Sequence, residues 1–171
     1  MPNYDGNEDH SGHWGYSFDQ LSDMLSEVVK AHSKSGKVTL ICHDFGCHYG
    51  YHFQKKYPEL VKRLAAIDIG PVSPSQWAVY LATAFYQWFN VVLFYVGEPA
   101  GGMMMRAFFA DSVKNWRPAK ELCPQMNYSY AKLWGNKCFC SSEVNRYNID
   151  ISKCPIFFCY GNKKAFNFHT K

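Results

Sequence analysis

The stretch that decides the fold is VTLICHDFGCHYGYHFQKKYPELVKRLAAIDIG, residues 38–70. It opens with residues 38–42, a short apolar run rich in β-branched residues, which is typical of a strand buried on both faces. A helical pattern follows, in which aromatic residues recur at steps of four until Pro58 breaks it. Residues 64–69 are a second apolar run, ended by a Gly-Pro pair. Strand, helix and strand over this length predict a βαβ unit with parallel strands.

A helix is expected just upstream of this unit. Ser17 and Gln20 have the spacing of a capping box, in which each side chain bonds the backbone N–H of the other residue. Apolar residues then recur at i, i+3, i+4, i+7 and i+8, which predicts a helix with one apolar face that ends near Gly36. The residues of that face are Leu21, Met24, Leu25, Val28 and Val29.

The downstream part of the chain changes character and then returns to the first pattern. Residues 75–150 are aromatic and read as helical, with breaks at the Gly-Glu-Pro of residues 97–99 and the Arg-Pro of residues 117–118. Residues 156–160 then have the composition of a further core strand.

The predicted fold class is therefore α/β, with a parallel sheet core and an inserted helical domain. The core is expected over residues 1–74, the helical insert over 75–150, and the returning core strand within 151–171. Linkers are expected near residues 71–75 and 148–154.

One stretch within the insert is apolar enough to raise the question of a membrane span. Residues 77–97 carry no charge, and about 20 apolar residues suffice to cross a bilayer. Gln87 and Asn90 lie in its middle, however, and no basic cluster flanks it to set an orientation. A buried, aromatic-rich pair of helices that covers a pocket is the preferred interpretation, and membrane association is not favoured.

The turn after the first strand has the pattern small–x–nucleophile–x–small, at Cys42, Asp44 and Gly46. In such a turn the central residue is strained, and the small residues on either side approach each other, so bulky side chains would clash. The helix N-terminus favours a negative charge at Asp44, and the N–H of Phe45 would point toward a developing oxyanion. Asp44 is therefore the candidate nucleophile, and the alternative is a carboxylate that only stabilises a turn.

A metal site is the competing interpretation of the same helix. Asp44, His48 and His52 recur every four residues and could share one helix face. In a strand–turn–helix unit, however, that helix packs on the sheet, and its later turns lie away from the turn. Cys138 and Cys140 have a poor spacing for zinc. We expect no metal and no cofactor.

Residues 40–46, Leu-Ile-Cys-His-Asp-Phe-Gly, resemble the strand-then-His-Asp-Trp-Gly signature of the aspartate-nucleophile branch of the α/β-hydrolase superfamily. This branch comprises the epoxide hydrolases and the haloalkane dehalogenases. The Tyr-Pro-Glu of residues 57–59 is similar to the turn after the family's elbow helix, and residues 2–6 resemble the loop after its fourth strand. The resemblance implies that a carboxylate attacks an sp³ carbon to form an ester, which a histidine-activated water then hydrolyses.

The resemblance also implies roles for residues outside the turn. Asp68 follows the second core strand, where some relatives carry the acid that orients the histidine; the alternative is a carboxylate that bonds a nearby loop. Tyr86, next to Gln87, is similar to the cap tyrosine that bonds the epoxide oxygen, and Tyr130 could supply the second. Ordinary packing is the alternative for each tyrosine. The expected substrate is a small apolar molecule.

Relative to the family, the chain is expected to be a fragment cut at both ends. Family members carry several strands and a His-Gly-x-Pro loop before this unit, and a histidine-bearing loop after the last strand. His169 follows residues 156–160 too soon to match that histidine, and Lys164 stands where many epoxide hydrolases have an acid. The catalytic histidine is therefore expected to be missing, so no turnover is expected of the chain by itself.

Two other functions are alternatives to epoxide hydrolysis. Dehalogenases of this branch usually carry a tryptophan after the nucleophile, whose N–H helps to bind halide, and Phe45 lacks that donor. Haloalkane or haloacid dehalogenation is therefore the second choice. A catalytically inactive α/β-hydrolase-like protein that binds a ligand or partner is the alternative from another class.

Composition sets the remaining expectations. Hydrophobic residues make up 47% of the chain and charged residues 19%, which argues against disorder. The net charge of +4 comes from scattered Lys and Arg residues without a basic stripe, so nucleic-acid binding is not expected. Several of the seven cysteines lie in apolar segments, and no secretory signal is recognisable, so a reducing compartment, the cytoplasm, is expected.

Overall fold

The computed structural model describes residues 15–70, 77–115, 118–134, 154–161 and 163. These residues fall into two compact units, an α/β unit and a helical unit. The predictions for residues 1–14, for most of both linkers, for Cys138 and Cys140, and for Lys164 and His169 lie outside the described residues.

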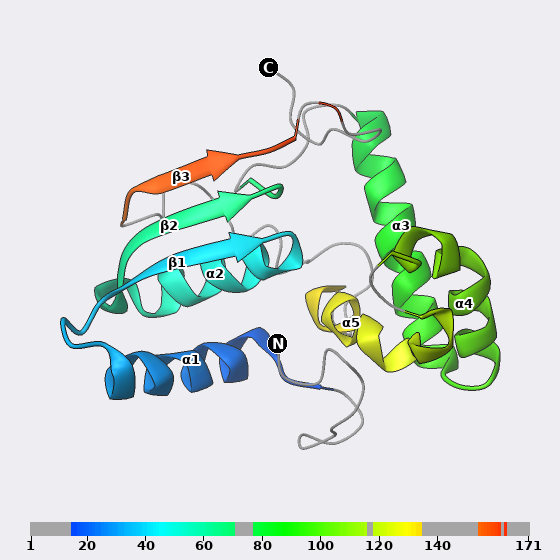
Figure 1. Ribbon diagram of the computed structural model, residues 1–171, viewed down its shortest axis with the longest axis horizontal. Helices are drawn as coiled ribbons and strands as arrows, with labels where there is room; N and C mark the ends of the chain where they lie inside the picture. Colours follow the sequence, from blue (N-terminus) through cyan, green and yellow to red (C-terminus); the bar gives the residue numbers. More distant parts are fainter. Residues whose placement is uncertain (1–14, 71–76, 116–117, 135–153, 162, 164–171) are drawn as a thin grey trace. The chain divides into compact units, whose positions relative to one another are not determined.

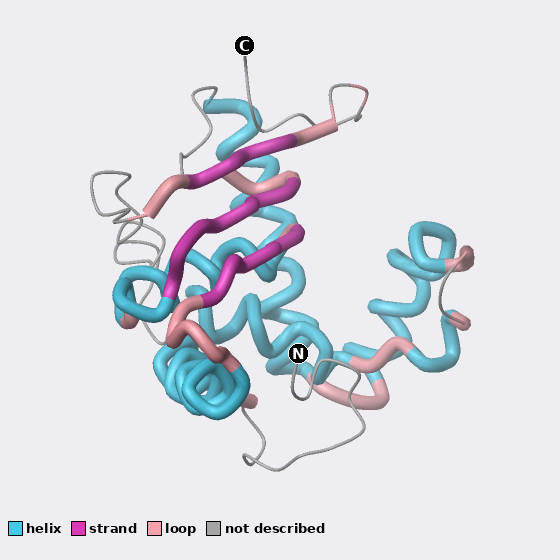
Figure 2. The backbone as a smooth tube through the Cα atoms, turned by 60° about the vertical axis from the view of Figure 1, so that its left-hand side comes forward, coloured by secondary structure: helices cyan, strands magenta, loops and turns pink. Residues whose placement is uncertain are grey.

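The α/β unit is built on a three-stranded parallel sheet. Its strands are β1 (Val38–His43), β2 (Val61–Ile67) and β3 (Ile156–Cys159), in the spatial order β1-β2-β3. Helix α2 (Phe45–Lys56) and a short 3₁₀ turn, η1 (Pro58–Leu60), join β1 to β2. Figure 2 shows the strands side by side in one sheet, and Figure 1 labels them. The predicted parallel βαβ unit is confirmed.

Strand β2 is displaced toward the N-terminus relative to the predicted run of residues 64–69. It begins at Val61 because that residue pairs with Val38 at the start of β1. It ends at Ile67 because Asp68 leaves the extended conformation, with a φ of 76°. Apolar composition predicts that a strand is present but not where it begins and ends. Those limits are set by strand pairing at Val61 and by the turn at Asp68.

Helix α1 (Phe18–His32) begins at the predicted capping box. Ser17 Oγ accepts from the Gln20 N–H at 3.1 Å, and Gln20 Oε1 accepts from the Ser17 N–H at 2.8 Å. The helix ends at His32 and not near Gly36, because Ser33 already adopts an extended conformation.

The predicted apolar face of α1 is only partly correct. Leu21 and Val29 are buried, but the other three members, Met24, Leu25 and Val28, are exposed. The buried stripe instead begins at Phe18, whose ring stacks on Tyr49 of α2 at a centroid distance of 4.4 Å. The stripe continues through two buried serines, Ser22 and Ser26. These small side chains leave room for α1 to pack against α2.

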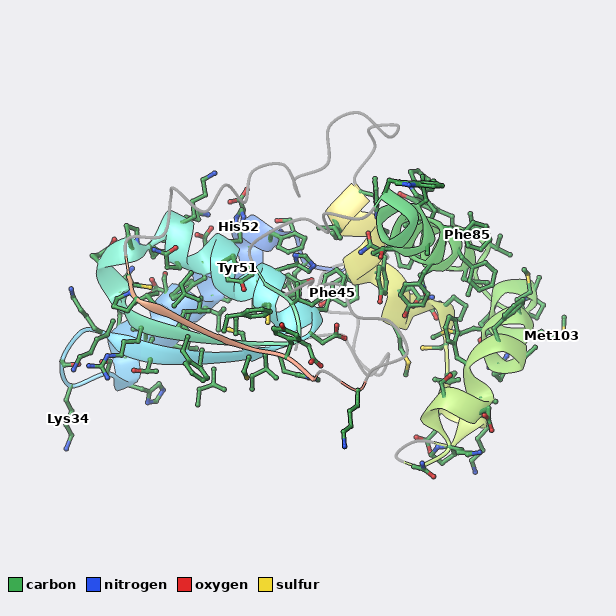
Figure 3. The ribbon with its side chains drawn as sticks, turned by 90° about the horizontal axis from the view of Figure 1, so that it is seen from above. Lys34, Phe45, Tyr51, His52, Phe85 and Met103 are labelled. Atoms are coloured by element: carbon green, nitrogen blue, oxygen red, sulfur yellow. The ribbon has the colours of Figure 1, made fainter. Side chains whose placement is uncertain are left out.

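The sheet is covered by helices on one face, and its opposite face is exposed. Figure 3 shows α1 and α2 on the same side of the strands. The prediction that the strands are buried on both faces is therefore wrong: Ile41 is 76% exposed and Phe157 67% exposed. Helix α2 is the crossover between β1 and β2, and α1 packs against α2, so both helices cover the same face.

A polar network joins α1 to α2 at the surface. His52 Nε2 lies 3.0 Å from Asp19 Oδ1, and Lys56 Nζ lies 2.7 Å from Asp23 Oδ1. The hydrogen bond from His52 lowers the pKa of Asp19, and the hydrogen bond from Lys56 lowers that of Asp23. Such exposed pairs contribute little individually, but together they fix the pairing of the two helices.

The helical unit contains most of α3 (Trp77–Val96), together with α4 (Ala100–Val113) and α5 (Tyr128–Trp134) (Figure 1). Two 3₁₀ turns, η2 (Ala119–Glu121) and η3 (Pro124–Asn127), lie between α4 and α5. Its buried side chains form two clusters. One joins α3, α4 and the segment that follows, through Leu93, Met105, Leu122 and Met126, and the other joins α3 to α5, through Phe94, Tyr128 and Ala131.

The uncharged stretch forms one continuous helix, α3, of 20 residues, so the prediction of a pair of helices is wrong. The prediction that it is buried is also wrong for much of its length, because Phe85 is 76% exposed and Val92 and Val96 are about half exposed. Within the part of the chain that the structure describes, no helix combines the length and apolarity that a membrane crossing requires.

Burial makes the stability of the α/β unit sensitive to acid through His48. Burial lowers the pKa of this imidazole from 6.5 to about 4. The unfolded chain therefore gains a proton near pH 6.5 that the folded chain excludes until about pH 4, so stability declines as the pH falls through this window. We expect the free energy of unfolding to fall by about 2 kcal/mol between pH 6.5 and about pH 5 because of this group.

The measurement is urea unfolding across this pH range for the wild type and for His48→Phe, which keeps a ring and removes the titrating group. The variant should show a flatter decline. His32→Phe, at an exposed position near the end of α1, is the control and should decline as the wild type does. Parallel declines in the wild type and His48→Phe would contradict the prediction.

Candidate active site

The candidate site is centred on the turn between β1 and α2. Asp44 occupies this turn with a φ of 50° and a ψ of −126°, a conformation that residues other than glycine rarely adopt. Holding such a residue costs about 1–3 kcal/mol, which the surrounding structure must offset. The Asp44 N–H donates to Ile67 O at 3.1 Å, and Asp44 O accepts from the Cys47 N–H at 2.9 Å. The side chain itself is exposed.

Close packing beneath this turn is provided by a glycine that the sequence pattern did not single out. A Cβ added at Gly50 would lie 2.4 Å from Cys42 Sγ, so a side chain at residue 50 would have to displace that thiol for α2 to keep its place against β1. The predicted clash at Gly46 is not found, since a Cβ there would meet no described atom within 4 Å. The steric demand for a small residue therefore lies one helical turn further along α2 than predicted.

Phe45, the predicted oxyanion donor, is the first residue of α2. Its N–H belongs to the first helical turn, whose N–H groups point out of the helix end and favour negative charge there. Its ring is buried and meets His48 edge-on, with the ring centroids 5.2 Å apart. This packing anchors the start of the helix beside Asp44.

Asp68 directly follows β2, so it lies at the same end of the sheet as Asp44, which follows the neighbouring strand β1. It is the second residue with a positive φ, 76°, that is not glycine, and its N–H donates to Cys159 O at 2.8 Å. Its carboxylate Oδ2 lies 3.0 Å from His43 Nε2. Asp68 is therefore paired with the histidine that precedes Asp44, a contact that the sequence reasoning missed.

Two further residues of the site were also missed, Cys47 and Tyr51. Cys47 Sγ donates to Ile67 O at 3.3 Å, and the Tyr51 hydroxyl donates to Ile69 O at 2.7 Å. The two residues are one helical turn apart on α2, so they share a helix face. This spacing, on the helix that follows the candidate nucleophile, is the one feature of the sequence that could have pointed to them.

Tyr86 and Tyr130, from α3 and α5 of the helical unit, lie together. Their hydroxyl oxygens are 3.2 Å apart, and their rings are nearly perpendicular, at 88°, with centroids 5.8 Å apart. Nearby, Trp134 Nε1 donates to Gln87 Oε1 at 3.0 Å. The two tyrosines predicted from separate motifs thus form one hydrogen-bonded pair.

The metal interpretation finds no support in the positions of its ligands. His48 is half-buried in α2 with its Nδ1 shielded from solvent, and His52 Nε2 is turned toward Asp19 of α1. No group of three His, Cys, Asp or Glu side chains that could hold a metal ion is found within the ranges that the structure describes.

The architecture is that of an α/β protein built on a parallel sheet. Comparison with protein-family models matches residues 1–150 to the alpha/beta hydrolase fold. The chain belongs to the α/β-hydrolase superfamily, which confirms the resemblance at that level. A search of curated proteins found no match.

The strain at Asp44 predicts an unusual response to substitution. Asp44→Gly should be more stable than Asp44→Ala by about 1 kcal/mol, because glycine adopts a positive φ without the steric cost that a Cβ imposes. Chemical denaturation of the two variants measures the difference.

Asp111, an exposed residue of α4, provides the matched control. There the order should reverse, with glycine less stable than alanine by about 1 kcal/mol, as is usual within a helix. If alanine were also the more stable residue at position 44, the turn would not be strained in the folded protein.

Proposed function

We propose that this protein is a hydrolase of the epoxide hydrolase type, in which Asp44 is the nucleophile of a nucleophile elbow. The observation that carries the proposal is the conformation of Asp44, with a φ of 50°, at the single residue between β1 and α2. A strained strand-to-helix turn holds its central side chain exposed at the end of a parallel sheet, which is where a nucleophile of this superfamily acts.

An aspartate at this position favours attack on an sp³ carbon. A carboxylate oxygen of Asp44 would form a bond to an epoxide carbon while the ring carbon–oxygen bond breaks, giving an ester and an alkoxide that takes up a proton. Water would then add to the ester carbonyl, and the alcohol would leave with the regeneration of the Asp44 carboxylate. The N–H of Phe45, at the start of α2, is assigned to the oxyanion of this second step.

Asp68 is assigned as the acid that orients an imidazole, and His43 is the imidazole that it contacts, at 3.0 Å. A carboxylate that accepts from one ring nitrogen fixes the orientation of the ring and stabilises its protonated form. The position of Asp68 at the end of the strand adjacent to β1 supports this role.

Tyr86 and Tyr130 are assigned to the epoxide oxygen, and the helical unit to the cap that bears them. Two phenols that can both donate to one oxygen would stabilise the alkoxide as the ring opens. The distance of 3.2 Å between their hydroxyl oxygens supports a shared role, because one small acceptor could then reach both. Apolar neighbours, including Phe109 at a centroid distance of 6.2 Å from Tyr86, favour a small apolar substrate.

Trapping the covalent ester tests the nucleophile. After incubation of the full chain with an aryl epoxide such as styrene oxide, mass spectrometry should find the adduct on the peptide that contains Asp44. Turnover is not needed, because ester formation precedes ester hydrolysis. Asp44→Ala should abolish the adduct, and Asp111→Ala, at an exposed carboxylate outside the site, should retain it. An adduct that survives Asp44→Ala would sink the proposal.

Substitution of the tyrosines tests the proposed role of the pair. Tyr86→Phe and Tyr130→Phe should each slow adduct formation by about 10²-fold, the contribution typical of one proton donor. The rate of adduct formation in the double variant should fall by less than the product of the two single decreases, since the two hydroxyls share a hydrogen bond. Tyr95→Phe, an exposed tyrosine of α3, is the control and should react at the wild-type rate. Unchanged rates in both single variants would show that the two tyrosines only pack against each other and do not act on the substrate.

A further inference from the structure

The carbonyl groups on both sides of Asp68 are bound by side chains of α2. Ile67 O, before it, accepts from Cys47 Sγ at 3.3 Å, and Ile69 O, after it, accepts from the Tyr51 hydroxyl at 2.7 Å. Tyr51 lies on α2, as does Phe45, which begins that helix (Figure 3). The Asp44 N–H also donates to Ile67 O at 3.1 Å, and the N–H of Asp68 donates to Cys159 O at 2.8 Å, so four described hydrogen bonds hold the backbone of this turn.

These two side chains remain donors at neutral pH. Burial raises the pKa of the Tyr51 phenol, and it also raises that of the Cys47 thiol. Tyr51 is the stronger of the two donors, because a thiol is a weak donor and its bond here is longer. The phenol therefore makes the main contribution to holding the segment after β2.

The held segment determines where the Asp68 carboxylate points. Asp68 has a φ of 76°, a conformation that an aspartate keeps only where neighbouring contacts enforce it. In that conformation its Oδ2 reaches His43 Nε2 at 3.0 Å, and His43 immediately precedes Asp44. The buried Tyr51 hydroxyl is thus connected, through Ile69 O and the Asp68 carboxylate, to the imidazole of His43. The His43 side chain is 64% exposed.

We propose that Tyr51 is a positioning residue of this site, which acts through Ile69 O and Asp68 to fix the orientation of the ring of His43, the residue that precedes Asp44. The relevance of this contact to catalysis rests on the proposed function. The contact itself does not, and it can be measured without substrate.

The reactivity of His43 toward diethyl pyrocarbonate, localised by mass spectrometry, reports the contact. When Asp68 accepts from Nε2–H, the lone pair open to the reagent is confined to Nδ1, the ring nitrogen next to the β-carbon and the more hindered of the two, so His43 should react slowly. Asp68→Asn and Tyr51→Phe should both accelerate its modification, by about fivefold, the equilibrium factor that corresponds to one lost hydrogen bond. Tyr57→Phe is the matched control, because the Tyr57 hydroxyl donates to Asp23 of α1, and it should leave the His43 rate unchanged.

Two outcomes would overturn the proposal. One is a wild-type rate at His43 in Tyr51→Phe, which would make Tyr51 merely structural even if the variant were less stable. The other is a wild-type rate in Asp68→Asn, which would remove the histidine–carboxylate contact altogether. Both are distinguishable from a failure of the proposed function, which would appear as a missing adduct at Asp44 while the His43 rates still respond.

A second variant keeps the test decisive if Tyr51→Phe does not fold. Cys47→Ala removes the weaker donor and should accelerate modification of His43 less than Asp68→Asn does. A rise as large as that of Asp68→Asn would show that the thiol, and not the phenol, positions the turn.

Discussion

The approach of α2 to β1 is the constraint on which the candidate site depends. The two elements can meet because Gly50 presents no side chain to Cys42, whose sulfur would lie 2.4 Å from a Cβ at that position. With the helix held so close to the strand, the chain has a single residue, Asp44, in which to reverse direction. Asp44 makes this reversal with a strained φ of 50°, and the residue is exposed at the end of the sheet.

The sheet itself holds the two strained carboxylates. The N–H of Asp44 reaches Ile67 O on the next strand, and the N–H of Asp68 reaches Cys159 O on the strand after that, so each residue continues the hydrogen bonding of the sheet after it has left the extended conformation. Parallel pairing places the two residues at the same end of the sheet, where open α/β sheets collect their functional groups. The side chains of α2 then fix the second turn from below.

Both units expose apolar side chains that composition alone would assign to a core. Ile41 and Phe157 lie on the open face of the sheet, and Phe85 and Met103 lie on the surface of the helical unit. Apolar residues tend to be buried, but which of them are covered depends on where the connecting helices pass.

The sequence by itself determined the parallel βαβ unit and the capping box at Ser17, and it singled out Asp44 as the candidate nucleophile, because each rests on local pattern and turn chemistry. Only the tertiary structure decided that Asp68 pairs with His43, that Gly50 carries the steric demand expected at Gly46, and that one face of the sheet is open. These features join residues distant in sequence, or depend on the rotation and course of a helix. The secondary-structure preferences of single residues cannot predict such features, because the contacts form only when the elements pack together.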